Sequence, residues 1–280
     1  MEESIFPELF TMTTEIMDEI LEVSQYWQRP ENTLFQLFSG NVIRNSDFLN
    51  SKILSSLRAA FVNSILLIRE NELDTIRFYS DPTYAPFDNV QGDDIEFANN
   101  TLRAISGKVY LINVDSANAE AFLNFTKNNF SELNGPGFAR IRTDTLSHFE
   151  ISKNNIYDSE MRMNFIYLLL DSYLINLNIW SNSFINSKLK CGTDMEYALR
   201  INLFDLMIPV ALPESNAQID SLIVSKFEFY KDQMYVTQIH ANSLFSLLVG
   251  QMPLNLTNST FEFVHVHDDG NLLEIASNDL

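Results

Sequence analysis

The segment that most constrains the fold is 158–184, the most apolar stretch of the chain. If this segment is a helix, its polar residues recur at intervals of four and seven positions and form one narrow stripe on an apolar cylinder. Asp158 or Ser159 would cap its first turn. The stripe consists of Glu160, Asn164, Asp171, Asn178 and Asn182. We therefore predict a central helix over 158–184 that is buried on several sides.

Two alternatives to this helix follow from the same residues. The first is a pair of buried strands at 163–170 and 173–180, which periodicity does not distinguish from a helix; the length of the segment favours the helix. The second is a membrane span, which needs about 18 consecutive apolar residues. Asp171, Asn176 and Asn178 interrupt the run before that length is reached, so no transmembrane segment is expected.

The segments before the central helix predict helices and one small mixed unit. Amphipathic patterns at 11–27 and 48–70 predict two helices within a helical region 1–80. A mixed α/β region, 95–190, follows and includes the central helix. Its first part is predicted to contain a helix at 95–105, a strand at 108–114, a helix at 117–128 and a strand at 138–143.

The last region, 195–280, is predicted to be mainly antiparallel β-structure. Strands at 219–230 and 234–240 would flank one hairpin turn. The sequence Asp-Asp-Gly-Asn at 268–271 is the clearest hairpin signal in the chain, between strands at 260–267 and 272–276. A chain whose helices come first and whose antiparallel sheet comes last is typical of the α+β class. The three regions can also pack as one compact domain.

Composition narrows the class of protein further. The chain has 280 residues, 46% of them hydrophobic, with 22 Phe and no apparent internal repeat. Its formal net charge of −19 and the lack of a dense Lys/Arg run argue against direct binding to nucleic acid or to an anionic membrane. The N-terminus is acidic and lacks the apolar core of a signal peptide. We therefore expect a cytoplasmic or virion location.

One pair of histidines is a candidate metal site. His265 and His267 would point to the same face of a strand, within reach of one metal ion. Asp269, Asp268, Glu262 or Glu274 would add an oxygen ligand. The alternative, which the shortness of the motif favours, is a half-exposed strand end beside a polar turn with no metal. His148 and His240, in contrast, are isolated in the sequence. No phosphate-binding loop, nucleophile elbow or zinc-protease motif occurs, and no cofactor is predicted.

A second candidate site is a protein-interaction surface on the predicted helix 11–27. Its acidic side is typical of a solvated face or of a docking surface for a basic partner. Bulky aromatic residues near its end are typical interface anchors. The candidate interaction residues are Glu15, Asp18, Glu19, Glu22, Tyr26 and Trp27.

These observations favour a non-enzymatic structural or assembly protein that works through protein partners, as a homo-oligomer. A viral or phage virion component, such as a connector or tail-region protein, is the specific form we expect. The first alternative is an acidic partner-binding protein or inhibitor that imitates nucleic acid, based on the charge of −19. The second is a metal-dependent enzyme that uses His265 and His267.

Overall fold

All the ordered elements in the described part of the chain are β-strands, and all their pairings are parallel. The computed structural model describes residues 33–49, 51–55, 63–79, 85–90, 94–107, 109–116, 121–143, 145–191, 203–208, 215–231, 243–249, 254–266 and 271–276. Within these residues the strands form three sheets, of eight, 11 and eight strands.

The three sheets are named A, B and C. Sheet A consists of β1 (Thr33–Ser39), β4 (Asn63–Arg69), β7 (Asp94–Ala98), β10 (Ala121–Thr126), β14 (Leu146–Ser152), β18 (Leu174–Trp180), β22 (Asn216–Asp220) and β25 (Leu254–Thr257). Sheet B consists of β2 (Val42–Leu49), β5 (Glu72–Tyr79), β8 (Thr101–Ser106), β11 (Asn129–Ser131), β12 (Asn134–Gly135), β15 (Asn155–Tyr157), β16 (Glu160–Met161), β19 (Ser183–Ile185), β20 (Lys188–Cys191), β23 (Ile223–Lys231) and β26 (Thr260–Val266). Sheet C consists of β3 (Leu54–Ser55), β6 (Phe87–Val90), β9 (Tyr110–Ser116), β13 (Gly137–Thr143), β17 (Ile166–Leu170), β21 (Phe204–Ile208), β24 (Ser243–Val249) and β27 (Asn271–Ala276).

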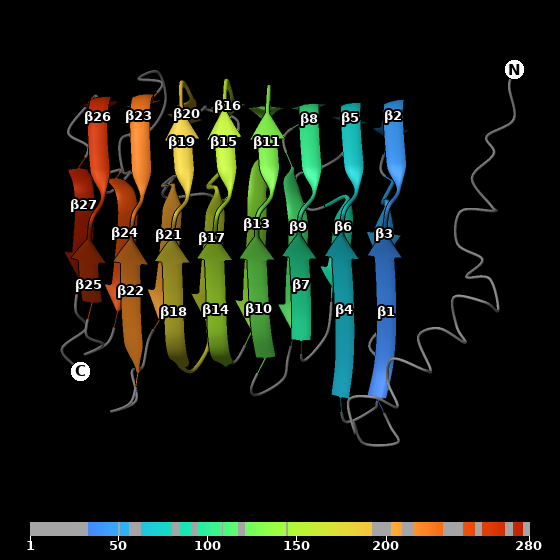
Figure 1. Cartoon of the computed structure of the whole chain (residues 1–280), viewed down its shortest axis with the longest axis horizontal. Helices are drawn as coiled ribbons and strands as arrows, with labels where there is room; N and C mark the ends of the chain where they lie inside the picture. Colours follow the sequence, from blue (N-terminus) through green and yellow to red (C-terminus); the bar gives the residue numbers. More distant parts are fainter. Residues whose placement is uncertain are drawn as a thin grey trace, which may run out of the picture.

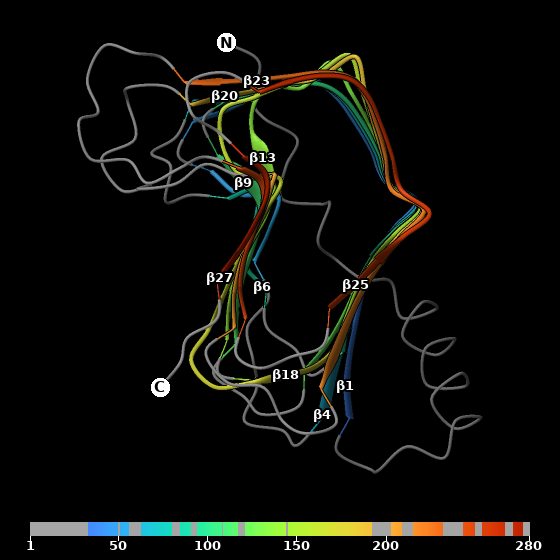
Figure 2. The ribbon, with the colours of Figure 1, turned by 90° about the vertical axis from the view of Figure 1, so that its left-hand side faces the viewer.

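The chain passes through sheets A, B and C in turn and so builds a β-solenoid of eight described coils. Figure 1 shows the strands of sheet A side by side, in chain order from β1 to β25. Figure 2 views the solenoid from the end that carries β25 to β27. There the chain climbs along sheet A, crosses the top through sheet B and descends along sheet C. The coils advance toward the viewer as the chain turns anticlockwise, so the winding is right-handed, as in other parallel crossovers.

The corner between sheets A and B is a tight turn with the same two features in successive coils. Its first residue has a positive φ, between 52° and 59° at Glu70, Asn99, Lys127, Lys153 and Ser181. Non-glycine residues adopt this conformation rarely, and it turns the chain sharply. The next residue is in each case a buried asparagine: Asn71, Asn100, Asn128, Asn154 or Asn182.

These asparagines form a ladder of hydrogen bonds that runs through the protein interior. The Asn100 side chain is a typical rung: its Oδ1 accepts from the Asn71 backbone N–H at 3.0 Å and from Asn71 Nδ2 at 2.9 Å. Its Nδ2 donates to the carbonyl of Ile68 at 2.9 Å and to Asn128 Oδ1 at 3.1 Å. From Asn71 to Asn154, each such side chain therefore satisfies buried backbone groups of the preceding coil and bonds to one asparagine on either side. Asn182 ends the ladder, and its Nδ2 donates to the carbonyls of Ile151 and Trp180.

A second bend divides sheet B and falls at the same place in each coil. Four positions after the ladder, Thr75, Ala104, Glu132, Asp158 and Asn186 again have positive φ. The residue that follows makes a shorter ladder in the middle coils: the Leu133 backbone N–H donates to Ser159 Oγ at 3.1 Å, and the Ser159 N–H donates to Ser187 Oγ at 3.3 Å. These bends separate β11, β15 and β19 from β12, β16 and β20.

The core is a continuous column of phenylalanine rings enclosed by the three sheets. Ring contacts run from Phe38 in the first coil to Phe227 in the seventh, through Phe87, Phe97, Phe138, Phe165 and Phe184, with centroids 5.0 to 6.4 Å apart. Most of these contacts are edge-to-face, the geometry that aromatic quadrupoles favour. These seven rings therefore lie inside the solenoid, one from each of the first seven coils, and build one shared core.

The predicted central helix is wrong. Residues 158–184 contain β16, β17 and β18 and the start of β19, and the two apolar runs are the strands β17 and β18, which is the alternative that periodicity left open. Asn164, Asp171 and Asn182 lie between strands, at successive corners of the coil. Short strands separated by polar corners reproduce the spacing of a polar stripe on a helix, and this coincidence explains the wrong prediction.

The α+β class is contradicted along the rest of the described chain as well. The described residues of the predicted helices at 48–70, 95–105 and 117–128 form strands and the corners between them, and the helix 11–27 lies outside the described residues. The strands predicted at 108–114 and 138–143 are confirmed as β9 and β13. They pair in parallel with each other and with neighbouring coils. The Asn99–Asn100 corner interrupts the apolar pattern that had suggested a helix at 95–105.

The antiparallel sheet predicted for 195–280 is also wrong. β26 and β27 follow one another in the chain, but β26 pairs with β23 and β27 pairs with β24, in different sheets. They therefore do not form a hairpin with each other. The segment 234–240, predicted as one arm of another hairpin, lies outside the described residues. In the part of the chain that the structure describes, no helix is long and apolar enough to cross a membrane.

The asparagine ladder predicts an asymmetry between two adjacent asparagines. Asn128→Ala removes the acceptor of the buried Asn100 backbone N–H and the donor to the Phe97 carbonyl. Because each of these two orphaned buried groups costs about 1–3 kcal/mol, we expect a loss of at least about 2 kcal/mol in unfolding free energy. Asn129→Ala is the control, since that side chain makes only a 3.5 Å contact with Tyr157. Equal urea midpoints for the two variants would contradict the ladder.

The strand assignment predicts a different asymmetry within β17. Leu168 is fully buried in sheet C, whereas its neighbour Leu169 is only partly buried. Leu168→Asp places an unpaired carboxylate in the core and should cost several kcal/mol. Leu169→Asp should cost much less, because alternate residues of a strand face opposite sides. Thermal melting of both variants measures the difference, and similar losses at the two positions would argue against the strand.

Candidate functional site

The outer face of sheet A carries side chains in parallel lines, because equivalent residues of successive coils are in register. The first line is Asp94, Phe122, His148, Asn176 and Asn216. The second is Glu96, Asn124, Glu150, Asn178, Gln218 and Asn255. The third includes Thr126, Ser152, Trp180, Asp220 and Thr257. Neighbouring members of a line are separated by about 4.8 Å, the spacing of paired strands. We call this surface the sheet A face.

Glu150 lies at the centre of a polar cluster in the middle of this face. Its Oε1 accepts hydrogen bonds from Ser152 Oγ at 2.7 Å and from Trp180 Nε1 at 3.2 Å. Its Oε2 lies 3.6 Å from His148 Nε2. The donors come from the same strand and from the next coil. They hold the carboxylate in one orientation while 26% of the Glu150 side chain stays exposed.

Two aromatic side chains lie on either side of the coil that carries Glu150. Phe122, one coil earlier, is 45% exposed and packs against the His148 ring with centroids 6.3 Å apart. Trp180, one coil later, is partly buried, and the Lys153 ammonium lies 4.4 Å from the centroid of its ring. Such a cation–π contact orients both partners. We call Phe122, His148, Glu150, Ser152, Lys153 and Trp180 the Glu150 cluster.

Amide side chains surround the Glu150 cluster. Asn124 and Asn178 occupy the neighbouring rungs of the line that contains Glu150. Asn124 also separates Glu150 from Glu96, so each carboxylate has an amide as its neighbour along the line. In the adjacent line, Asn216 Nδ2 donates to Asn176 Oδ1 at 2.6 Å. The cluster therefore combines a fixed acceptor, amides that both donate and accept, and aromatic rings, a set suited to hydrogen-bonding a polar ligand.

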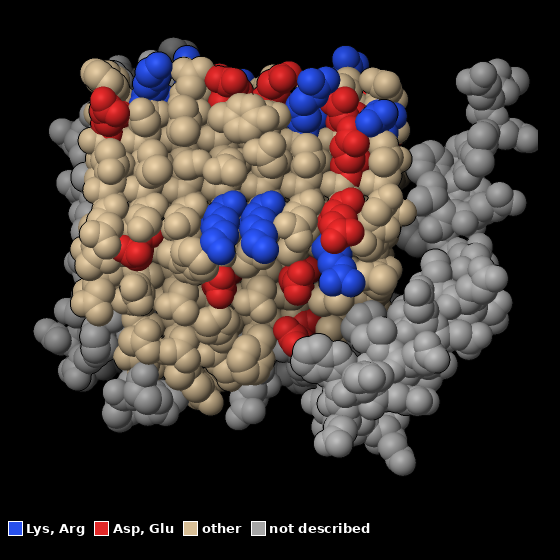
Figure 3. Space-filling view, in the orientation of Figure 1, with Lys and Arg blue, Asp and Glu red and all other residues tan. Residues whose placement is uncertain are grey.

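The sheet A face is mainly uncharged despite the acidity of the chain. Figure 3 shows this side of the molecule, where scattered cations and carboxylates interrupt a surface of other residues. The described carboxylates on this side do not form the continuous array that imitation of nucleic acid would require. Charge on this face is therefore local to particular residues.

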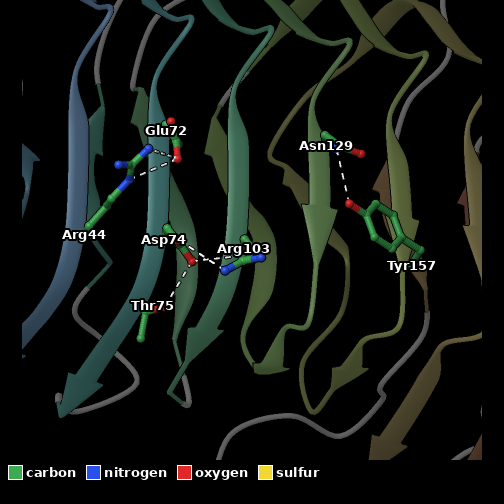
Figure 4. A network of polar contacts seen from close by, with 7 residues as sticks. All are labelled: Arg44, Glu72, Asp74, Thr75, Arg103, Asn129 and Tyr157. Atoms are coloured by element: carbon green, nitrogen blue, oxygen red, sulfur yellow. Dashed lines mark hydrogen bonds and ion pairs between the residues drawn. The ribbon is translucent and has the colours of Figure 1, made fainter.

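A second polar network, on the first three coils of sheet B, links consecutive coils (Figure 4). Arg44 contacts Glu72 at 2.6 Å, and Arg103 contacts Asp74 at 3.1 Å. The Arg103 hydrogen bond holds the pKa of Asp74 below its ordinary value, and Thr75 contributes in the same direction. Exposed ion pairs of this kind add little stability. We therefore assign this network to holding neighbouring coils in register.

Asp220 makes a comparable link between the last two described coils. Its carboxylate accepts from Thr257 Oγ1 at 2.7 Å, Asn258 Nδ2 at 2.9 Å and Ser221 Oγ at 3.0 Å. These hydrogen bonds, that of Thr257 first, lower the pKa of Asp220 below its ordinary value. The side chain joins β22 to the corner that follows β25.

The site residues predicted from the sequence are mostly outside the described structure. Glu15, Asp18, Glu19, Glu22, Tyr26 and Trp27 lie there, as do His267 and Asp269. His265 is exposed on β26, in register with Glu228 of β23. Among the described residues, no group of three or more His, Cys, Asp or Glu side chains is placed to hold a metal ion.

Sequence reasoning missed the Glu150 cluster altogether. In the sequence His148 is isolated from other histidines, and Trp180 falls within the predicted central helix 158–184. The available signal was the alternation of apolar and polar residues in 146–152 and 174–180, which is typical of strands with one solvated face. Even so, only parallel pairing of the two strands brings Glu150 and Trp180 together.

The lowered pKa of Asp220 predicts a pH-dependent stability. A folded pKa below the unfolded value of about 3.9 contributes stability that is present above that value and is lost as the pH falls through the folded pKa. The difference in unfolding free energy between the parent and Asp220→Asn should be constant from pH 5 to 7 and should shrink below about pH 4. Urea unfolding at several pH values measures it.

The matched control for this prediction is Thr257→Val, which removes the hydrogen bond with the largest effect on the pKa of Asp220. In the Thr257→Val background, Asp220→Asn should again change the unfolding free energy, but the part of that change that is lost at low pH should be smaller. A difference between parent and Asp220→Asn that stays the same down to pH 3 would contradict the assignment.

Comparison with known proteins adds no family to these observations. No protein-family model matches the chain, and neither the curated proteins nor the solved structures contain a match.

Proposed function

We propose that the chain is a non-enzymatic structural protein and that its solenoid is a rigid building block of a larger assembly. The specific form is a virion component, such as a connector or tail-region protein. The observation that carries the proposal is the unbroken ladder from Asn41 to Asn182, which ties six successive coils into one body.

A solenoid suits this role because its length grows with the number of coils. Each coil contacts only its neighbours, and eight coils at the rung spacing of about 4.8 Å extend over about 34 Å between the first and the last. The interior is a column of buried phenylalanine and aliphatic side chains. A stiff stack of coils holds its two ends at a constant separation, as a spacer in an assembly must.

Exposed apolar side chains in the terminal coils support association of copies. In the first two coils, Leu49 and Tyr79 are opposite each other in register and are 70% and 52% exposed. In the last coil, Phe263 is 65% and Leu256 is 41% exposed. Among the described strands, β2 and β26 have a partner on one side only. Free strand edges beside apolar side chains favour pairing with another chain.

The experiment is light scattering on the full chain. We expect a mass above the 32.2 kDa of one chain, and we expect Phe263→Asp to lower it toward the monomer. Ile185→Asp is the matched control, since Ile185 is an exposed apolar residue of a middle coil and should leave the mass unchanged. A parent that remains monomeric at every concentration would contradict the proposal and favour the acidic partner-binding class.

The salt dependence of association distinguishes a structural assembly protein from an acidic partner-binding protein. Repulsion between chains of net charge −19 is screened at ionic strengths above about 0.15 M. An assembly held by apolar and strand-edge contacts should therefore persist or grow as salt is added. A complex held by carboxylates against a basic partner should instead weaken. Dissociation of the native oligomer in high salt would argue against structural assembly.

A further inference from the structure

We infer that the sheet A face, centred on the Glu150 cluster, binds a neutral oligosaccharide chain. This inference is independent of the structural role proposed above, because a rigid rod can carry a ligand-binding face whether or not its ends associate. It rests on three observations: the placement of the aromatic rings, the orientation of the hydrogen-bonding groups and the regular repeat of the lines.

The aromatic rings provide apolar platforms on a polar surface. Phe122 is 45% exposed although it lies outside the phenylalanine column, in a line whose other members are polar. Trp180, two coils away, is partly buried and donates its indole N–H to Glu150, and the Lys153 ammonium lies over its ring, 4.4 Å from the centroid. Sugar rings have C–H faces that pack on aromatic rings and hydroxyls that point sideways. Two platforms on either side of a carboxylate match that chemistry.

The hydrogen-bonding groups between the platforms are oriented before any ligand arrives. Ser152 and Trp180 fix Oε1 of Glu150, while Oε2 is 3.6 Å from His148, beyond a good hydrogen bond. Oε2 therefore has capacity to accept from a ligand hydroxyl. Asn124 and Asn178 flank it in register, and neither side chain has a hydrogen-bond partner among the described residues. Preorganised groups reduce the entropic cost of binding.

The regular repeat favours a chain molecule over a compact ligand. The line through Glu150 continues with Gln218 and Asn255, both exposed, at one polar side chain per coil. A linear polysaccharide that lies along the solenoid axis meets a donor or acceptor about every 4.8 Å. The mainly uncharged character of this side favours a neutral sugar over a polyanion or a polycation (Figure 3).

The test uses the fluorescence of Trp180. The chain has two Trp residues, so Trp27→Phe makes Trp180 the only one. This variant is titrated with hexasaccharides of β-1,4-glucose, α-1,4-glucose, β-1,4-N-acetylglucosamine and α-1,6-mannose. The full chain is also run in affinity electrophoresis through soluble polysaccharides of the same linkages. We expect a saturable change in emission with at least one of these sugars, and retardation by the corresponding polysaccharide.

Substitutions on the sheet A face test whether this surface binds the sugar. In affinity electrophoresis, Phe122→Ala, Trp180→Ala and Glu150→Gln should each weaken binding about tenfold, as the loss of one good contact does. Tyr157→Ala is the matched control, because Tyr157 is an outward aromatic residue of sheet B with 36% exposure. It should bind as the parent does. Unchanged urea midpoints show that each variant is folded.

Two results would overturn the inference. One is that no sugar of the panel binds the parent. The other is that the three sheet A variants bind as tightly as the parent, or that Tyr157→Ala loses as much affinity as they do. Light scattering of the same variants separates this outcome from a failure of the structural proposal, since the sheet A substitutions should leave the mass of the assembly unchanged.

Discussion

The buried asparagine ladder is the interaction on which the solenoid depends. Each coil has to reverse direction at a tight corner, and a tight corner leaves backbone N–H and C=O groups that point into the interior. An asparagine side chain supplies both an acceptor and two donors. From Asn71 to Asn154 it satisfies a backbone N–H and a backbone carbonyl of the coil before it, and it also bonds to the next asparagine. A shorter or purely apolar side chain at this corner would leave those groups unpaired.

The ladder also explains why the coils can differ in length without losing register. Consecutive ladder positions are 26 to 30 residues apart, so the sequence has a repeat without a constant period. The corner between sheets A and B stays invariant, and the variation is taken up elsewhere in the coil. Where Leu222 and Ser259 take the place of asparagine, the Leu222 backbone N–H still finds an acceptor in Ser259 Oγ, 37 residues away. The backbone N–H at this corner is therefore hydrogen-bonded even where the ladder position is not an asparagine.

The constant register between neighbouring strands of sheet A places polar residues from distant parts of the chain side by side on one surface. Because sheet A is parallel and unshifted between β14 and β18, Glu150 and Trp180 stand on adjacent coils although they are 30 residues apart in the chain. The same register places Asn124 and Asn178 on either side of Glu150. The proposed structural role and the inferred sugar-binding face thus share one physical origin. A stiff, evenly spaced scaffold serves both as a spacer and as a template for a repeating ligand.

The sequence by itself determined the local properties of the chain. The patterns at 108–114 and 138–143 predicted the strands β9 and β13, and the apolar character of 158–184 predicted a buried segment, within which Leu168 is fully buried. The polar residues at 164, 171 and 182, which predict a stripe on a helix, lie instead at the corners between strands. Tertiary structure alone decided what those elements became. In β17 and β18 the choice between helix and strand depended on partners 27 to 40 residues away, and pairing at that distance leaves no trace in local periodicity. The Glu150 cluster was hidden for the same reason: its members acquire a common site only when parallel pairing aligns separate coils.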